Sequence, residues 1–242
     1  MNSILDENPR GVFLSGDITE GPFLESTLEF LGKRIGRPLY FVLGNHDTLL
    51  TSFQSAHSKV RALCKRYRNL IWMTEAGIIE LTPEVALVGM EGWYDARVGN
   101  PDYIRFTFDW WMTEDFRKLP DMHARLQAFR DLAIKSAETL SARVEEAVAR
   151  YKVVYLLTHY PPWEEAHRST NPWFEKFWQA YNCNIALGEA LERVMEKHKN
   201  RQLIVLCGHT HQNTSVIVSR NTTCQVGQAS YTHLTDGHRI YI

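Results

Sequence analysis

Residues 39–47 read Leu-Tyr-Phe-Val-Leu-Gly-Asn-His-Asp, an apolar run that stops at a glycine-containing polar turn. The run has the length and the β-branched and aromatic content of a buried strand rather than of a helix. An apolar run followed by a polar turn occurs at three other places in the chain. These are 12–14 before Ser15-Gly16-Asp17, 153–157 before Thr158-His159, and 203–206 before Cys207-Gly208-His209-Thr210-His211.

Helical patterns separate these apolar runs. Apolar residues recur at helical spacing, beside a charged face, over residues 23–34, 122–151 and 186–197. Beyond the last polar turn, short apolar runs joined by turns predict strands at 215–218, 222–226 and 239–242. Strands that alternate with helices and are then followed by strands alone predict an α/β layered domain with a mixed sheet.

The composition is that of an ordinary globular protein. The 242 residues carry a net charge of −1, with 44% hydrophobic and 23% charged residues, which excludes disorder, collagen-like repeats and coiled coil. A near-zero net charge also excludes a binder of nucleic acid that works by bulk electrostatics. Nucleic acid as a partner is therefore not indicated by the charge, although a local basic patch would permit it.

Cysteine usage and the chain start bear on location. No basic segment followed by an apolar one resembles a secretory signal, and no apolar run approaches the roughly 20 residues of a membrane helix. The four cysteines have no C-x-x-C spacing, so we expect free thiols and a cytoplasmic location. Nothing in the sequence indicates an oligomeric state. The cysteines are Cys64, Cys183, Cys207 and Cys224.

The polar turns all follow strands, and loops at the carboxyl ends of strands gather at one edge of a sheet. We therefore expect their side chains to converge there. A set of carboxylate, amide oxygen and imidazole donors without thiolate suits one or two divalent transition-metal ions, Mn, Fe or Zn, that keep open positions. Two such ions about 3.5–4 Å apart clamp the attacking and leaving oxygens in phosphoryl transfer. The residues are Asp17, Asn45, His46, His159, His209 and His211.

The ordered series GD, GNHD, H and GHTH resembles the calcineurin-like metallophosphoesterase family over residues 15–211. That family reads D-x-H, GD, GNH[D/E], a lone H and GHxH. Four motifs in the right order, each after an apolar strand, are far more specific than any one of them. The resemblance implies a sandwich of two mixed β-sheets flanked by helices.

The resemblance also implies a ligand set for the metal ions. Asp17 would bridge two ions. Asn45, His159 and His209 would complete the second metal position, and His211 would serve the first.

Catalytic roles follow in the same way from the GNHD motif. Asn45 and His46 would bind the phosphate, and His46 would also protonate the leaving oxygen. Asp47 would orient the imidazole ring of His46. A water or hydroxide bound to the metal would attack phosphorus.

One departure from the family pattern concerns the first metal position. Sixteen residues precede Asp17, and none of them forms the D-x-H motif. We therefore expect residues 1–242 to form a single domain that is N-terminally incomplete and lacks the first strand. The second position should bind metal, and the first should be weak or empty.

Two functions follow from these observations. The first is metal-dependent hydrolysis of a phosphate mono- or diester. The alternative is a non-catalytic scaffold or binding domain that kept the fold with an impaired metal site. Six polar groups aimed at one point would destabilise a pure scaffold, because their burial and mutual repulsion would be uncompensated, so we favour the enzyme.

Three further segments have two interpretations each. The aromatic residues of 93–111 could wall a substrate pocket or form core. The basic run 59–68 could be a nucleic-acid patch or the solvated face of a helix. A group of aromatic residues after His159 could form a lid over the metal site or a partner surface. This last group is Trp163, Trp173, Phe174, Phe177 and Trp178.

Overall fold

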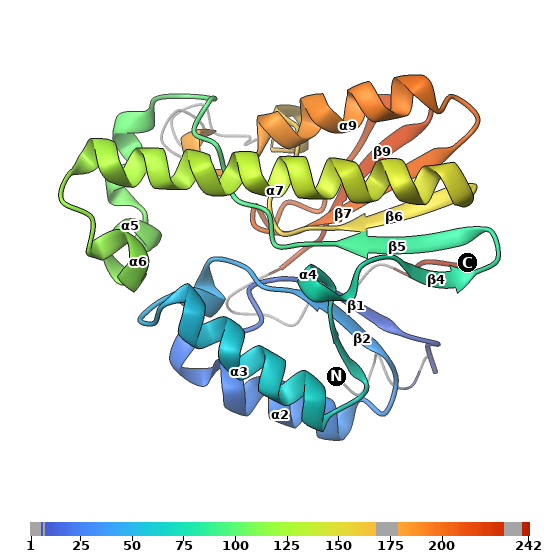
Figure 1. The fold of residues 1–242 in the computed structure, drawn as a ribbon, viewed down its shortest axis with the longest axis horizontal. Coiled ribbons are helices and arrows are strands. Elements are labelled where there is room, and N and C mark those ends of the chain that lie inside the picture. Colours follow the sequence, from blue (N-terminus) through green and yellow to red (C-terminus); the bar gives the residue numbers. More distant parts are fainter. Residues whose placement is uncertain (1–5, 7, 168–178, 230–238) are drawn as a thin grey trace.

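The computed structural model describes residues 6, 8–167, 179–229 and 239–242, and it shows two β-sheets lying face to face between layers of helices (Figure 1). The smaller sheet has the order β1-β2-β3, and all its pairs are parallel. The larger sheet has the order β4-β5-β6-β7-β9-β8 and mixes parallel with antiparallel pairs. The predicted α/β sandwich is therefore confirmed.

The strands are short and mostly buried. Their bounds are β1 Val12–Ser15, β2 Leu39–Val42, β3 Leu70–Trp72, β4 Ile79–Thr82, β5 Val85–Gly89, β6 Val153–Leu157, β7 Gln202–Cys207, β8 Ser215–Ser219 and β9 Thr222–Val226. The α-helices are α2 Leu24–Arg34, α3 Phe53–Arg66, α4 Met73–Ala76, α5 Phe108–Met112, α6 Glu114–Arg117, α7 Met122–Arg150 and α9 Ile185–Lys197. Short 3-10 helices are η1 Gly21–Phe23, η2 His46–Thr48, η3 Pro101–Phe106, η4 Glu164–Ala166 and η5 Gln179–Tyr181.

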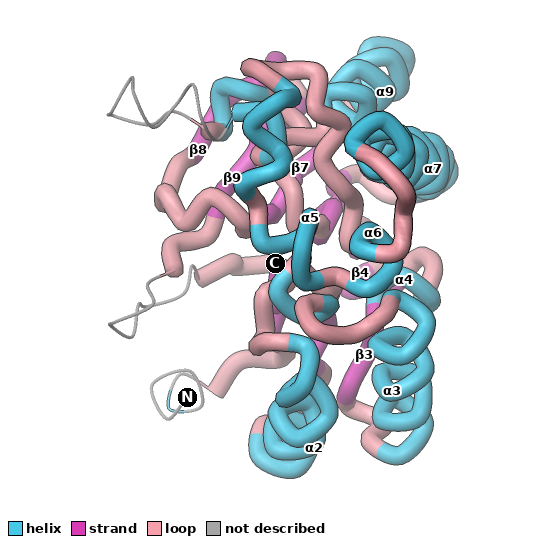
Figure 2. The backbone as a smooth tube through the Cα atoms, turned by 90° about the vertical axis from the view of Figure 1, so that its left-hand side faces the viewer, coloured by secondary structure: helices cyan, strands magenta, loops and turns pink. Residues whose placement is uncertain are grey.

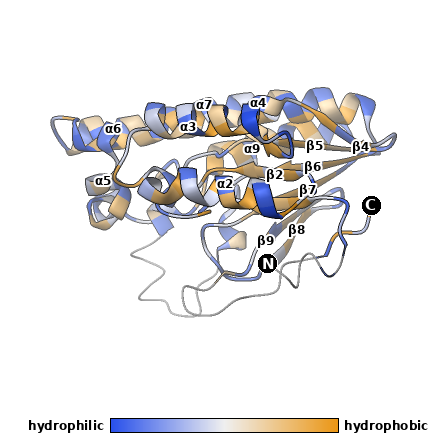
Figure 3. Ribbon diagram, turned by 90° about the horizontal axis from the view of Figure 1, so that it is seen from below, coloured by the Kyte–Doolittle hydropathy of each residue, from blue (hydrophilic) through white to orange (hydrophobic). Residues whose placement is uncertain are grey.

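Three apolar layers hold the sandwich together. Helices α7 and α9 cover the outer face of the larger sheet, and α2 and α3 cover that of the smaller one (Figure 2). Between the sheets, side chains such as Val42, Leu87 and Leu157 form the middle layer. Burial of such side chains is the main favourable contribution to folding. The strands are accordingly largely apolar, whereas the helices carry both polar and apolar faces (Figure 3).

The crossovers place the carboxyl ends of the parallel strands at one edge. Helix α7 links β5 to β6, and α9 links β6 to β7, with all three strands parallel and in register. In the smaller sheet, Ser15 of β1 is paired with Val42 of β2. The predicted polar turns therefore leave the two sheets on the same side, which is the arrangement that assembles a site.

Residues 90–121, between β5 and α7, form a cap at that end of the sandwich. Some of its aromatic side chains form core, as one interpretation of the sequence expected, and others are exposed. Trp93, Tyr94 and Trp110 are buried in an aromatic core with Phe129 of α7. Phe108 and Trp111 are 63% and 58% exposed, so the cap also presents aromatic surface.

The sequence patterns fared differently from one element to another. The predicted helices agree with α2, α7 and α9 to within a residue at their starts and ends. The predicted strand at 239–242 is wrong, since these residues have no regular structure, although Ile240 packs between the sheets. Strands β3, β4 and β5 were not predicted, because they lack the polar turns that follow β1, β2, β6 and β7.

Two other segments can be placed. The basic run lies on α3, where Arg61 pairs with Glu75 and Arg66 with Glu29. Of the aromatic group after His159, Trp163 is buried against α9 and donates from Nε1 to Glu192. The other members, Trp173, Phe174, Phe177 and Trp178, lie outside the described residues.

The outer edge of β1 has no strand partner within the described part of the chain, and no described strand precedes it. All four of its residues are half-buried, whereas β2 beside it is mostly buried. Among the described residues, no helix is long and apolar enough to cross a membrane.

Arg143 of α7 ties the two halves of the sandwich together. Its guanidinium donates to the carbonyl oxygens of Gly89 at the end of β5 (2.8 Å) and of Met73 and Thr74 in α4 (3.3 and 2.8 Å). Replacing Arg143 with Met should therefore lower the free energy of unfolding by about 3 kcal/mol, since charged hydrogen bonds are lost and carbonyls are left unsatisfied. Chemical denaturation measures this change.

The matched control is Lys135→Met, on the exposed face of the same helix. It should change stability by no more than about 0.5 kcal/mol. Equal losses of unfolding free energy in the two variants would show that the hydrogen bonds of Arg143 do not stabilise the fold.

Candidate metal centre

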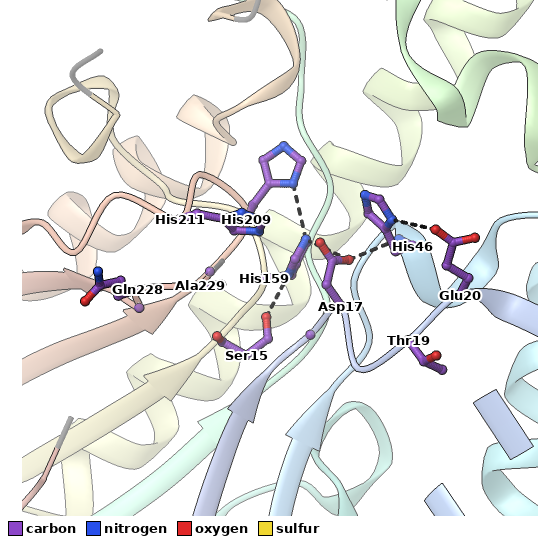
Figure 4. A pocket seen from close by; sticks show the side chains of 13 residues that line it. Ser15, Asp17, Thr19, Glu20, His46, His159, His209, His211, Gln228 and Ala229 are labelled. Carbon is purple, nitrogen blue, oxygen red and sulfur yellow. Dashed lines mark hydrogen bonds and ion pairs between the residues drawn. The ribbon is translucent and has the colours of Figure 1, made fainter. Parts of the chain in front are cut away.

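A pocket of about 330 Å³ opens where the polar turns meet, and five of the predicted residues line it as Figure 4 shows. Side chains of Asp17 after β1, His159 after β6 and His209 after β7 point toward one another. Their ligand atoms all lie within 4.8 Å of one another. The convergence predicted from strand ends is therefore seen for these three residues. The pocket is lined by Ser15, Gly16, Asp17, Thr19, Glu20, His46, His159, Gly208, His209, His211, Gly227, Gln228 and Ala229.

Asn45 completes a group of four facing atoms. Its Oδ1 lies 3.2 Å from Nε2 of His159 and 3.2 Å from Nδ1 of His209. The two ring nitrogens are 3.2 Å apart, and Asp17 Oδ1 is 3.4 Å from His159 Nε2. A carboxylate oxygen, an amide oxygen and two imidazole nitrogens thus surround one point.

Partners behind the ligands decide which atoms face that point. Nδ1 of His159 is 2.7 Å from the Ser15 carbonyl oxygen, and Nε2 of His209 is 3.0 Å from that of Tyr181. A carbonyl oxygen only accepts, so each of these nitrogens carries the ring proton. Asn45 Nδ2 donates to Asp109 Oδ1 over 3.0 Å, which turns Oδ1 of Asn45 inward.

The consequence is a cluster of lone pairs. With neutral rings, none of the four inward atoms carries a hydrogen, so each can only accept. Four acceptors at these distances repel one another unless a cation lies between them. The donor set, two imidazoles and two oxygens without thiolate, is one that divalent transition metals accept. The residues therefore fit a metal ion.

Electrostatics at the site favour the ligand forms. Loss of hydration, with His159 nearby, lowers the pKa of His209 well below its usual value, so the ring is neutral near pH 7. Burial opposes ionisation of Asp17, but His159, His46 and His209 together with the backbone N–H of His46 lower its pKa. A neutral imidazole and an ionised carboxylate are the forms that bind metal.

The turns that carry these side chains are strained and tightly packed. Asp17, His209 and His211 have φ of 52°, 64° and 58°, in the left-handed region that non-glycine residues seldom occupy. Such strain persists only where surrounding structure imposes it, and it clusters at functional sites. Gly44 allows the closest approach, because a Cβ there would lie 2.1 Å from Asp17 Oδ1.

Asp47 links two of the turns that carry the site. Its buried carboxylate accepts from the backbone N–H groups of Ile18 (3.2 Å), Thr19 (2.9 Å) and Gly44 (2.8 Å). These bonds join the turn after β1 to the turn after β2. The role expected for Asp47 in orienting the His46 ring stays a prediction. Burial raises the pKa of Asp47 to about 7, against the lowering effect of these bonds.

His46 and His211 lie on the wall of the same pocket, outside the four-atom group. The backbone N–H of His46 donates to Asp17 Oδ1 (3.0 Å), and its ring Nδ1 lies 3.9 Å from Glu20 Oε1. Burial lowers the pKa of His211, so that this ring is also neutral near pH 7. Each predicted site residue except Asn45 and Asp47 thus faces the pocket directly.

Sequence reasoning missed the groups behind the ligands. Asp109 lies in the cap, 64 residues from its partner Asn45, and belongs to no motif. The carbonyl oxygens of Ser15 and Tyr181 are backbone atoms, which a sequence pattern does not reveal. Glu20 carries a usable signal, since it follows the GD motif by three positions and lines the pocket.

With this geometry in place, comparison with known proteins is decisive on the family. The profile of the calcineurin-like phosphoesterases matches residues 1–213. The chain belongs to the calcineurin-like phosphoesterase family. Membership implies a hydrolase that acts on phosphate esters and depends on metal.

Solved structures share the fold of this calcineurin-like phosphoesterase. The protein TT1561 of Thermus thermophilus is 11% identical with a TM-score of 0.50, covering 94% of this chain and 80% of its own. A dimetal phosphatase from Danio rerio (LOC 393393) is 12% identical with a TM-score of 0.54, covering 94% and 76%. Identities this low show the common fold alone. No curated protein matches the chain.

The close approach at Gly44 makes a sharp prediction. Gly44→Ala should abolish tight Mn²⁺ binding, because the added Cβ would meet Asp17 Oδ1 and also lie 2.5 Å from the Asp17 backbone nitrogen. Equilibrium dialysis against Mn²⁺ measures the binding. As a control, Gly36→Ala has a φ of 60° but nothing within 4 Å of its Cβ, so it should lose some stability and keep its metal. Undiminished Mn²⁺ binding by Gly44→Ala would contradict the assigned centre.

His209 should make the stability of the metal-free protein depend on pH. Its folded-state pKa is lowered, so the unfolded chain takes up a proton that the folded one resists. The contribution is present above about pH 6.5, the usual histidine value, and is lost as the pH falls below it. His209→Asn should make the decline shallower by up to about 1.4 kcal/mol per pH unit.

The measurement is chemical denaturation of both proteins in chelator between pH 5 and 8. Parallel curves of stability against pH for the wild type and His209→Asn would show that His209 is not held neutral by the fold.

Proposed function

We propose that this chain hydrolyses phosphate mono- or diesters with the help of a divalent metal ion. The observation that carries the proposal is the group of four acceptor atoms, from Asp17, Asn45, His159 and His209, in a pocket that His46 also lines. A scaffold gains nothing from lone pairs that repel one another, whereas a metal-dependent hydrolase requires them.

The four atoms define one metal position of the proposed centre. Asp17 is anionic and Asn45, His159 and His209 are neutral, so the set leaves net positive charge on a divalent ion. Asp17 and His211 are the side chains we assign to the other position, which makes that one the weaker. The metal is manganese, iron or zinc, since each accepts mixed nitrogen and oxygen ligands.

A divalent ion held by Asp17, Asn45, His159 and His209 would supply positive charge to the phosphoryl oxygens and would activate water as the nucleophile. The protein's own groups do the rest. His46 binds the phosphate group and gives a proton to the departing oxygen, whereas Asn45, whose Nδ2 donates to Asp109, serves as a metal ligand. Glu20 lies beside the His46 ring, with its Oε1 3.9 Å from Nδ1.

The backbone fixes these groups with respect to one another. Asp17 accepts from the N–H of His46, and Asp47 clamps the turns that bear both residues. The backbone of His46 is therefore held in a set position relative to the metal ligands. Such fixed positioning lowers the barrier because little reorganisation is left for the reaction itself.

A reducing compartment suits the proposed enzyme, and we place it in the cytoplasm. All four cysteines are free, and the sulfur atoms of Cys207 and Cys224 lie 3.6 Å apart in a thiol hydrogen bond without forming a disulfide. Reduced thiols so close to one another are stable where glutathione and thioredoxin keep them reduced.

Hydrolysis of an aryl phosphate monoester and of an aryl phosphate diester, with and without Mn²⁺, tests the proposal. We expect Mn²⁺-dependent turnover of at least one of the two. His46→Ala should keep its Mn²⁺ and lose about 100- to 10,000-fold in turnover, the usual contribution of a general acid. Asp17→Ala should lose the metal itself.

The two variants separate the roles. Loss of Mn²⁺ from His46→Ala would show that this residue is a ligand rather than the acid. A wild-type protein that neither binds Mn²⁺ nor hydrolyses either ester would favour the scaffold over the enzyme.

A further inference from the structure

Asp109 is a buried acid that no motif explains. It is 2% exposed, and it is the second residue of α5 in the cap. Its negative charge raises the pKa values of three buried tyrosines, after burial as the larger cause. These are Tyr94, Tyr160 and Tyr181. A carboxylate among aromatic rings is costly to bury, so its presence calls for a compensating interaction.

That interaction is with the metal centre. Asp109 Oδ1 accepts a hydrogen bond of 3.0 Å from Nδ2 of Asn45, which is itself 5% exposed. An amide group has an acceptor and a donor end, and a half-turn exchanges them. With the donor end inward, Asn45 would present hydrogens to His159 and His209, and it could not ligate a cation.

The cap is fastened so that this contact is maintained. The N–H of Leu50 donates to the Met112 carbonyl at the end of α5, and that of Glu114 donates to Thr51 (2.9 and 3.0 Å). Both bonds join the cap to the segment that follows η2. Thr107 Oγ1 accepts from the N–H of Trp110 at the start of α5. Asp109 and Asn45 are thus carried by segments that two backbone hydrogen bonds join a few residues beyond the contact.

We propose that Asp109 is a positioning residue that selects the metal-binding orientation of Asn45. A carboxylate suits this task because, when ionised, it only accepts, and so it faces the Nδ2 end of Asn45. The inference rests on the proposed metal-dependent function, and it adds a residue from the cap to the support of the centre. Groups that orient metal ligands in this way affect metal affinity about 10- to 100-fold.

The test is the affinity for Mn²⁺, measured by isothermal titration calorimetry. Asp109→Leu, which has a similar volume and no acceptor, should bind Mn²⁺ about 10- to 100-fold more weakly than the wild type. Asp109→Asn keeps an acceptor oxygen and should restore most of the affinity. Asp109→Ala serves the same purpose as Asp109→Leu if the leucine does not fit.

Two controls separate positioning from a general loss of structure. Thr113→Val replaces a residue that is 0% exposed in the same segment, and it should leave Mn²⁺ affinity unchanged. Phe129→Leu, in the aromatic core below α5, should lower the melting temperature and also leave the affinity unchanged. A drop in affinity for Phe129→Leu equal to that for Asp109→Leu would overturn the proposal.

A double-mutant cycle tests the route of the effect. If Asp109 acts through Asn45, then Asp109→Leu has no further effect on Mn²⁺ affinity in an Asn45→Ala protein. An equal loss in both backgrounds would overturn the proposal, as would an Asp109→Leu protein that binds like the wild type. A wild-type protein that binds no Mn²⁺ would overturn the proposed function and this role together, so the two failures are distinct.

Discussion

The structure is organised around four hydrogen-bond acceptor atoms that face one another with no hydrogen between them. Asn45 Oδ1, His159 Nε2 and His209 Nδ1 are mutually 3.2 Å apart, and Asp17 Oδ1 lies 3.4 Å from His159 Nε2. Each is unable to donate, because its proton is engaged behind it or absent. Such a cluster opposes folding in water alone, and it becomes favourable when a cation neutralises it. The rest of the site is arranged to enforce this condition.

Enforcement comes from the backbone as much as from side chains. The carbonyl oxygens of Ser15 and Tyr181 hold the protons of the two imidazoles, and the carboxylate of Asp109 holds the amide of Asn45. Asp47 draws two turns together through backbone N–H groups, and Gly44 lets them meet. Left-handed backbone at Asp17, His209 and His211 is the strain that this packing imposes.

The cap is part of this support and not an appendage. It contributes Asp109 from α5, and it packs through Trp93 and Tyr94 against Tyr160, the residue next to His159. Its exposed rings, Phe108 and Trp111, belong to the same short helix as Asp109. The five-residue helix α5 therefore carries both the exposed rings of the cap and the carboxylate that contacts the metal ligand Asn45.

Much of this could be predicted from the sequence, and the reason is local. Apolar runs that end in Gly-Asp, Gly-Asn-His-Asp, Thr-His and Gly-His-Thr-His each indicate a strand and the polar turn after it. Strands β1, β2, β6 and β7 and the residues Asp17, Asn45, His159 and His209 could therefore be identified together. Strands β3, β4 and β5 could not, since short buried runs without a polar turn resemble other core segments.

What only the tertiary structure decided is which atom of each side chain faces the metal position. That choice depends on partners distant in the chain, such as Asp109 for Asn45 and the Ser15 carbonyl for His159, 144 residues away. It also set the buried carboxylate of Asp47 against the backbone N–H groups of two turns, and it left 239–242 without a strand. The sequence determines which donors are available, because residue type is local. Their orientation is settled by hydrogen bonds that exist only after the sheets and the cap have packed.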